Sequence, residues 1–182
     1  MPSLLPLPRS RSLFVLPWVL AIGTLAPNAV ATVVAMSTAQ LTQASSLVVV
    51  GRVARTEARW TPDHQRIVTV AAVIVDDVLK GQWGRRRVLV EHEGGEVGDM
   101  GLVVTDTPSL AKGERVVLFL TEGREERGKK IHRVVGEIQG KYQVDERGVA
   151  KKGDMDAVGD LSQVDFELPF EQLVATIRRA VK

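Results

Sequence analysis

The chain has 182 residues, with 24 basic and 22 acidic side chains and no cysteine. Disulfides and thiolate metal sites are therefore excluded, and packing alone must stabilise the fold. The two excess positive charges, Arg9 and Arg11, precede an expected cleavage site, so the rest of the chain is formally neutral. A nucleic-acid partner is not expected, because such proteins normally carry a basic excess or stripe.

Residues 1–31 are predicted to be a signal peptide. Arg9 and Arg11 form a positive segment, which is followed by an apolar run and by an A-x-A pattern that ends at Ala31. The apolar run is shorter than the ~20 residues that a membrane span needs. We expect cleavage after Ala31, with Ala35 as the second choice, and no retained transmembrane segment. The expected location is periplasmic or extracellular, reached by the general secretory route.

A short helix is predicted first after the leader, because Ser37-Thr38-Ala39-Gln40 matches a capping box. Five β-type runs follow, bounded by residues that favour turns. They cover residues 47–60, 67–79, 88–93, 102–105 and 115–120. The order of these elements predicts a mainly β protein.

The first two runs indicate a curled sheet. Gly51, or the residues just after it, suits a bulge, because the side chains beyond it change from apolar to charged. The second run is apolar on both faces up to Asp76, as expected where one face lines a core and another element covers the opposite face. We therefore predict an OB-like β-barrel of five or slightly more strands, with a short N-terminal helix and a C-terminal amphipathic helix.

The predicted domain organisation places the barrel in residues 32–150. Its last hairpin turns at Asp145-Glu146-Arg147-Gly148. Residues 151–167 are polar and rich in glycine and aspartate, and are predicted to be a loop or linker. Residues 168–182 are predicted to be a helix packed on the barrel. Its apolar stripe has the three- and four-residue spacing of one helix face and consists of Phe170, Leu173, Val174, Ile177 and Val181.

Several short motifs, taken in order, resemble a known family. They are the V-V-x-G-x-V run around Gly51, the charged strand that ends near Trp60, Val78-Leu79-Lys80-Gly81, Gly94-Gly95, Gly113-Glu114 before Val117-Leu118-Phe119-Leu120, Gly136, and Gly140-Lys141-Tyr142. Over residues 38–145 the chain resembles a group of uncharacterised exported bacterial proteins. Their strand order is similar to that of the netrin-like domain of tissue inhibitors of metalloproteinases, which is an OB-type five-stranded barrel flanked by helices.

The resemblance does not extend to the inhibitory group. Inhibitors of that family present an N-terminal cysteine whose amine and carbonyl chelate the zinc of the protease. This chain has no cysteine, so no residue can be assigned that role. Thr32 would offer a free amine after cleavage, but nothing in the sequence holds it rigid. The resemblance therefore implies a fold and leaves the activity open.

Two motifs superficially suggest catalysis. The sequence His92-Glu93-Gly94-Gly95-Glu96 has part of a zinc-helix pattern, but its glycines oppose a helix and Glu96 replaces the second histidine. The sequence Ser109-Leu110-Ala111-Lys112 has the S-x-x-K spacing of serine acyl-enzymes, but the companion motifs are absent. We expect an exposed strand end and a loop at these places. No catalytic residue, metal ligand or cofactor is predicted.

The weak candidates for binding are aromatic and basic side chains. Aromatic residues can line the binding face of an OB sheet, and a basic run can contact an anion. The candidates are Trp60, Trp83, Tyr142, Arg85, Arg86 and Arg87. For each aromatic residue, packing in the core is an equally good interpretation. The run of arginines is more typical of a charged start to a hairpin than of an anion site.

The sequence favours an exported, non-catalytic binding module that recognises a protein partner, for which a secreted protease is one candidate. The first alternative is a metal-assisted or serine hydrolase that uses His92 and Ser109. It requires these side chains to converge in one pocket within hydrogen-bond reach. The second alternative is a barrel that binds a sugar or a lipid. It requires a deep apolar cavity lined by Trp60.

Overall fold

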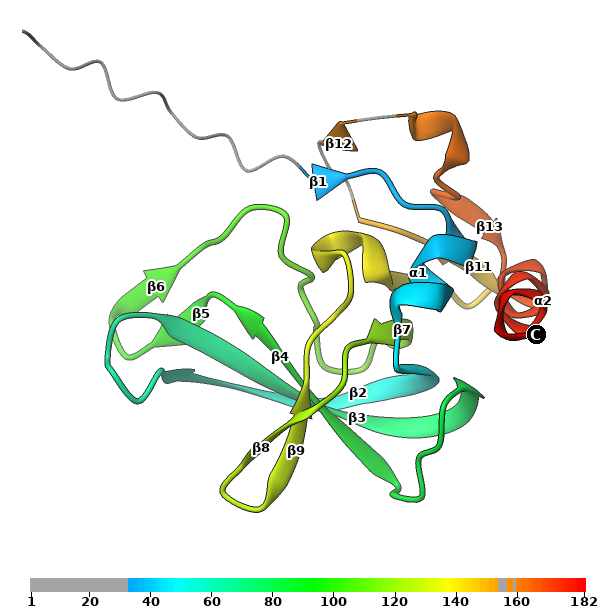
Figure 1. Cartoon of the computed structure of the whole chain (residues 1–182). Helices are drawn as coiled ribbons and strands as arrows, with labels where there is room; N and C mark the ends of the chain where they lie inside the picture. Colours follow the sequence, from blue (N-terminus) through cyan, green and yellow to red (C-terminus); the bar gives the residue numbers. More distant parts are fainter. Residues whose placement is uncertain (1–32, 154–156, 159) are drawn as a thin grey trace, which may run out of the picture. The chain divides into compact units, whose positions relative to one another are not determined.

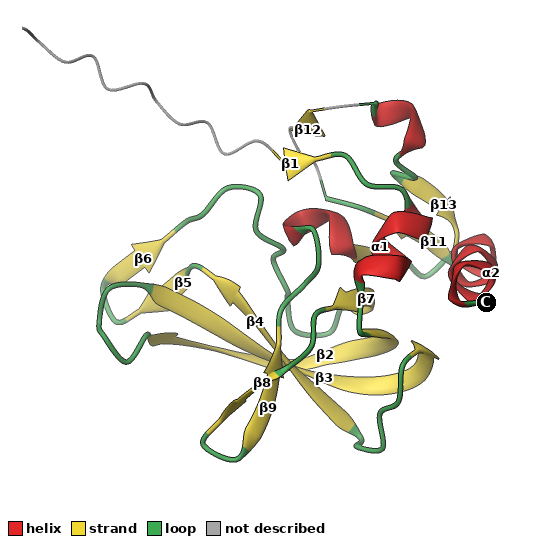
Figure 2. Ribbon diagram, viewed as in Figure 1, coloured by secondary structure: helices red, strands yellow, loops and turns green. Residues whose placement is uncertain are grey.

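The computed structural model describes residues 33–153, 157–158 and 160–182. The predicted signal peptide and the cleavage site after Ala31 lie outside these residues. The described part is mainly β, with two α-helices, α1 (Thr38–Ala44) and α2 (Phe170–Val181) (Figure 2). Neither α-helix is long and apolar enough to cross a membrane, and no other helix of the described ranges is.

The strands lie in one large sheet and two small ones (Figure 1). The large sheet has the order β13-β11-β10-β7-β2-β3-β4-β9-β8, and β4 and β9 are parallel. Its strands are β2 (Leu47–Trp60), β3 (Ile67–Lys80), β4 (Arg87–Glu93), β7 (Arg115–Leu120), β8 (Arg124–Glu126), β9 (Lys129–His132), β10 (Lys141–Val144), β11 (Val149–Lys151) and β13 (Glu167–Pro169). The small sheets pair β1 (Val33–Val34) with β12 (Ala157–Val158), and β5 (Gly95–Val97) with β6 (Met100–Leu102).

The predicted OB-like barrel of five or slightly more strands is not confirmed. The sheet has nine strands, and its ladders run from β13 to β8 without closing. The difference arises at both ends, where β10, β11 and β13 continue the sheet beyond β7 and the β8–β9 hairpin continues it beyond β4. What the structure establishes is a mixed, mainly β sheet with helices packed against it.

Strand β2 has the bulge that was predicted at Gly51. Its register with β3 shifts between Val50 and Gly51 and again between Val53 and Arg55. A Cβ atom at Gly51 would lie 2.3 Å from the carbonyl oxygen of Ile74, so only glycine allows the two strands this close approach. The bulge bends β2, and its two halves therefore have different surroundings.

Two apolar clusters form the core. The inner cluster joins β2, β3, β4 and β7 through side chains such as Val53, Val73, Val90 and Leu118. The helix-side cluster covers the opposite face of β2 and β7, where Val48 and Phe119 belong to the same buried cluster as Leu173 of α2. The predicted capping box of α1 is present. The predicted C-terminal helix is present as α2. It begins at Phe170 and not at residue 168, because residues 167–169 form strand β13.

Two predicted segments differ from the structure. The predicted strand at 102–105 is wrong: β6 ends at Leu102, and Val103 is 94% exposed in a loop. The predicted linker at 151–167 contains regular structure, namely the end of β11, the strand β12, a 3-10 helix (Leu161–Gln163) and the start of β13. Lys152 and Val164 of this segment are buried, which explains its regularity, because buried side chains need a fixed backbone.

Candidate binding site around the end of strand β4

The residues predicted for binding are dispersed over the molecule. Trp60 is half-buried and its ring stacks on His64 at 6.3 Å. Trp83 packs against the inner cluster, with its ring edge-on to His132 at 5.2 Å between centroids. The three arginines at 85–87 are exposed just before and at the start of β4. None of these residues lines the cavities described below.

Tyr142 is fully buried and packs in the helix-side cluster. Its hydroxyl bonds to Thr38 Oγ1 at 2.9 Å, and Thr38 in turn donates to Asp165 at 2.6 Å. Burial raises the pKa of Tyr142 well above its ordinary range, although the hydrogen bond between its hydroxyl and Thr38 acts in the opposite direction. Its ring therefore belongs to the core and is not accessible to a partner.

The end of β4 brings together the polar groups that sequence analysis did not connect. Consecutive residues of a strand point to opposite faces, so Glu91 and His92 serve different sides of the sheet. Strand β4 pairs with β9 only at Leu89 and Val90. Beyond Val90, this edge of β4 therefore has no paired strand in the described ranges.

The first cavity at this edge has a volume of about 400 Å³ and lies against Glu91, His92 and Glu93. Its other wall is the segment from Val104 to Pro108, with Arg133, Val134 and Glu137 behind. Three of its side chains, Val104, Pro108 and Val134, are apolar. The cavity thus combines apolar walls with carboxylates at its rim, as sites that hold a side chain commonly do.

The second cavity, of about 580 Å³, is lined by both His92 and Ser109 and by the loop that contains Val103. His92 Nδ1 lies 2.9 Å from the carbonyl oxygen of Glu93. A carbonyl oxygen only accepts, so Nδ1 must carry the proton and Nε2 presents a lone pair. This Nε2 is buried and has no hydrogen-bond partner in the described part of the chain. Burial lowers the pKa of His92, so the neutral ring is favoured.

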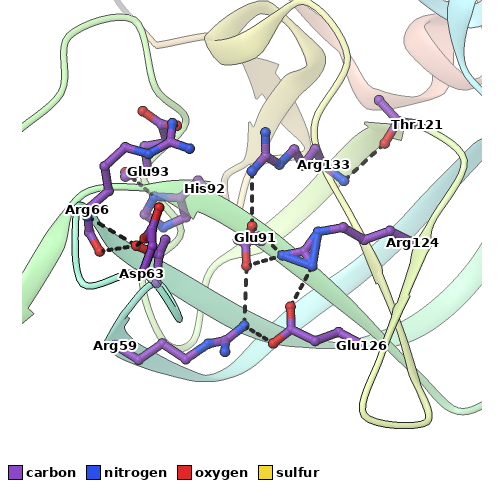
Figure 3. A network of polar contacts seen from close by, with 11 residues as sticks. Arg59, Asp63, Arg66, Glu91, His92, Glu93, Thr121, Arg124, Glu126 and Arg133 are labelled. Atoms are coloured by element: carbon purple, nitrogen blue, oxygen red, sulfur yellow. Dashed lines mark hydrogen bonds and ion pairs between the residues drawn. The ribbon is translucent and has the colours of Figure 1, made fainter.

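Glu91 is the centre of an arginine cluster on the other face of β4 (Figure 3). Its buried carboxylate accepts hydrogen bonds from Arg124 at 2.7 and 2.8 Å, from Arg133 at 3.2 Å and from Arg59 at 3.4 Å. Glu126 bridges two of these arginines, at 2.6 Å to Arg59 and 2.5 Å to Arg124. The cluster links β2, β4, β8 and the segment after β9, and so fixes their relative positions.

The ionisation of Glu91 follows from these contacts. Burial alone would raise the pKa of its carboxyl group, because a desolvated charge is costly. The hydrogen bonds and charges of Arg124 and Arg133 outweigh burial and hold the pKa below its ordinary value. Glu91 is therefore ionised at neutral pH, and its charge is fully compensated.

An apolar surface lies beside the second cavity. On the β5–β6 hairpin and the residue after it, Met100 is 58% exposed and Val103 is 94% exposed. Leu102 and Val104, on either side of Val103, help to line the cavity. No group of three or more His, Asp or Glu side chains in the described ranges could hold a metal ion.

Sequence analysis missed the Glu91 cluster and the exposed hairpin. Glu91 had one usable signal, since it is a carboxylate within the alternating strand of 88–93 and faces the same side as Leu89. Nothing in the sequence identified Arg59, Arg124 and Arg133 as its partners. Comparison with known proteins adds no assignment, because neither a protein-family model nor a curated protein sequence matches this chain.

Proposed function

We propose that this protein is an exported, non-catalytic binding module that recognises a protein partner through the β5–β6 hairpin and the cavity beside it. The observation that carries the proposal is the exposure of two large apolar side chains, Val103, which lines that cavity, and Met100 on strand β6 beside its lining residues Gly101 and Leu102. Large apolar side chains that gather at a cavity mark interaction sites more often than isolated ones do. The polar groups of His92 and Glu93 in the same cavity would give such a contact its specificity.

The proposal includes an OB-like arrangement of the central strands, similar to a netrin-like domain. Its support is the strand order β7-β2-β3-β4-β9 within the large sheet, whose first four strands surround the inner cluster. An antiparallel bridge from Leu120 of β7 to Val134, just after β9, brings the two ends of this order into contact. The amide of Val135 also donates to the carbonyl oxygen of Phe119 at 2.8 Å. Strong NMR contacts between the backbones of Leu120 and Val134 are expected, and their absence would contradict this arrangement.

The hydrolase alternative has one observation in its favour, because His92 and Ser109 line the same cavity. Against it, no hydrogen bond joins Ser109 to His92 in the described ranges, and the proton of Nδ1 is held by a backbone carbonyl and not by a carboxylate. A serine nucleophile needs its base within hydrogen-bond reach. Ester or peptide hydrolysis that disappears in both Ser109→Ala and His92→Gln would overturn the binding proposal.

The alternative of a sugar or lipid barrel is less well supported. It predicted a deep apolar cavity lined by Trp60, but Trp60 lies outside the cavities described above. The space between the central strands is filled by buried valine and leucine side chains. A ligand of the size of a fatty acid would have to displace them.

The decisive experiment uses the immobilised full chain to retain proteins from the secreted fraction of its own organism. We expect a defined protein to be retained by the wild type and lost with Met100→Ser/Val103→Ser. The matched control is Leu161→Ser/Val181→Ser, which changes two apolar side chains that are each 44% exposed elsewhere. Equal retention by the wild type and both double variants would contradict the proposed surface.

A secreted protease is the first partner to test, because the proposed fold resembles that of protease inhibitors. The zinc-chelating cysteine of that family is missing, so any inhibition must use another surface. We expect inhibition of the target protease to be lost in Met100→Ser/Val103→Ser and retained in the control. If the retained protein is not a protease, the proposal of a protein-binding module is supported and a protease is excluded as its partner.

A further inference from the structure

A groove lies on the same sheet face as Glu91, away from the β5–β6 hairpin. One wall is the second half of β2, with Arg55, Glu57 and Arg59, and the other is the β8–β9 hairpin, from Glu126 to Lys129. Direct pairing of Arg55 with Ala72, and of Ala72 with Leu89, places these positions on one face. The groove has a volume of about 210 Å³, which suits one side chain of a ligand.

The floor and the rim of this groove differ in chemistry. The floor is apolar and consists of Val70, Ala72, Leu89 and Ile131. The rim carries four cationic side chains, Arg55, Arg59, Arg127 and Lys129, against the two carboxylates of Glu57 and Glu126. An apolar floor under a cationic rim fits an apolar side chain flanked by acidic groups.

Arg59, on the β2 wall of the groove, is held in place without a ligand. Arg59 Nη2 lies 2.6 Å from Glu126 and 3.4 Å from the buried Glu91. These two carboxylates fix the guanidinium across the sheet, so little side-chain entropy remains to be lost on binding. Arg55, in contrast, reaches Glu57 only at 4.0 Å and is exposed.

Arg127 has an unusual backbone conformation at the tip of the β8–β9 hairpin. Its φ is +49° and that of the following Gly128 is +72°. A two-residue turn with both φ values positive favours asparagine before the glycine, because a larger side chain is strained there. An arginine at this position weakens the turn and places a cation at the rim of the groove.

We propose that this groove binds an extended acidic segment of a polypeptide, with one apolar side chain on the floor and acidic side chains against the rim. The surface is separate from the β5–β6 hairpin, and the inference does not depend on the function proposed there. A polypeptide is favoured over a nucleic acid because the floor of the groove is apolar. A phosphate backbone offers no apolar side chain to cover this floor, whereas an acidic peptide that contains one leucine does.

The experiment measures binding of a fluorescein-labelled peptide, Glu-Glu-Leu-Glu-Glu, to the full chain by fluorescence anisotropy. The variant is Arg127→Asn/Lys129→Gln, and we expect it to bind about tenfold more weakly. The matched control is Arg147→Asn/Lys151→Gln, which makes the same changes at the β10–β11 hairpin and should bind within about twofold of the wild type. Asparagine suits the turn better than arginine does, so Arg127→Asn alone should keep or raise the melting temperature.

Two comparison probes complete the experiment. Replacing the glutamates of the peptide with glutamine, or its leucine with glycine, should each weaken binding. The proposal is overturned if the neutral peptide binds as tightly as the acidic one, or if both hairpin variants lose binding equally. Tighter binding of an oligothymidylate than of the acidic peptide would also overturn it, because the surface would then recognise polyanions in general.

Discussion

The two halves of strand β2 are embedded in different ways. In residues 47–53 every side chain except Arg52 is buried, between the inner cluster on one face and the helix-side cluster on the other. In residues 54–60 the side chains are half-buried or exposed, and Arg59 belongs to the charged cluster around Glu91. The bulge near Gly51 separates the two. One strand thus anchors the core with its first half and presents a charged surface with its second.

A buried ionisable side chain lies on each side: Glu91 in the charged cluster that contains Arg59, and Lys152 in the helix-side part of the core. The surroundings of the two side chains differ. Glu91 is surrounded by three arginines. Lys152, on the helix side, lies over the ring of Tyr142 at 4.4 Å and donates to the carbonyl oxygen of Gln139. No carboxylate of the described ranges lies within ion-pair distance of Lys152. The charged region therefore compensates its buried charge with opposite charges, whereas burial on the helix side lowers the pKa of Lys152 and disfavours its charged form.

The largest effect is expected from removing a core side chain on the helix side. Phe119 is fully buried and packs against Tyr142, with 6.1 Å between ring centroids. Phe119→Ala should lower the free energy of unfolding by about 4 kcal/mol, because the cavity it leaves cannot collapse fully. Leu89→Ala, under the charged region, should cost about 1–2 kcal/mol because Leu89 is only partly buried. Urea denaturation followed by circular dichroism measures both, and equal losses would contradict the contrast between the two regions.

The next effect concerns Lys152. Burial lowers its pKa from 10.5 to about 7, and the charge of Asp165 offsets only part of this. Between these two values the unfolded chain binds a proton that the folded chain does not, so stability rises with pH in that window.

From pH 7 to pH 9 we expect the free energy of unfolding of the wild type to rise by about 2–3 kcal/mol relative to Lys152→Met. Methionine keeps the unbranched shape and removes the titrating amine. Parallel curves for the two proteins between pH 7 and pH 9 would show that Lys152 keeps its charge in the fold.

The third effect is expected from removing the charge of Glu91, which three arginines surround. Glu91→Gln should lower the free energy of unfolding by about 2 kcal/mol at pH 7, because three arginines lose their common carboxylate. The arginines keep partial access to water, which limits the loss. The control Glu93→Gln breaks an exposed pair with Arg66, at 2.6 Å, and should cost less than about 1 kcal/mol.

The pH dependence of this effect has the opposite sign to that of Lys152. The pKa of Glu91 lies below its ordinary 4.5, so its contribution is complete above that value and is lost as the pH falls through the folded pKa. The difference between wild type and Glu91→Gln should therefore shrink below pH 4.5. A difference that stays constant down to pH 3 would mean that the side chain acts through packing alone.

The sequence predicts features formed by residues that are close together along the chain, and it does not predict contacts between residues that are far apart along the chain. The capping box of Ser37 and Gln40 and the bulge near Gly51 are local patterns, and the structure contains both. The Glu91 cluster is not local, since its arginine partners are 32, 33 and 42 residues away along the chain.

The sequence also did not reveal which side chains are exposed to water and which are buried. The apolar run at Leu102, Val103 and Val104 predicts a strand by composition, but Val103 faces water on a loop. Likewise, the composition of residues 151–167 is typical of a linker although Lys152 is buried. Composition indicates what a residue prefers, and only the tertiary packing decides whether the preference is met.

The smallest effect is expected at Arg55, where stability and the proposed binding groove can be separated. Its pair with Glu57 is at 4.0 Å, and both side chains are mostly exposed, at 64% and 69%. Arg55→Ala should therefore change the free energy of unfolding by less than about 0.5 kcal/mol. If the groove binds acidic peptide as proposed, the same variant should weaken that binding by about threefold, and added salt should reduce the difference. A large loss of stability in Arg55→Ala would show that the second half of β2 depends on its charges in the way that the first half depends on its core.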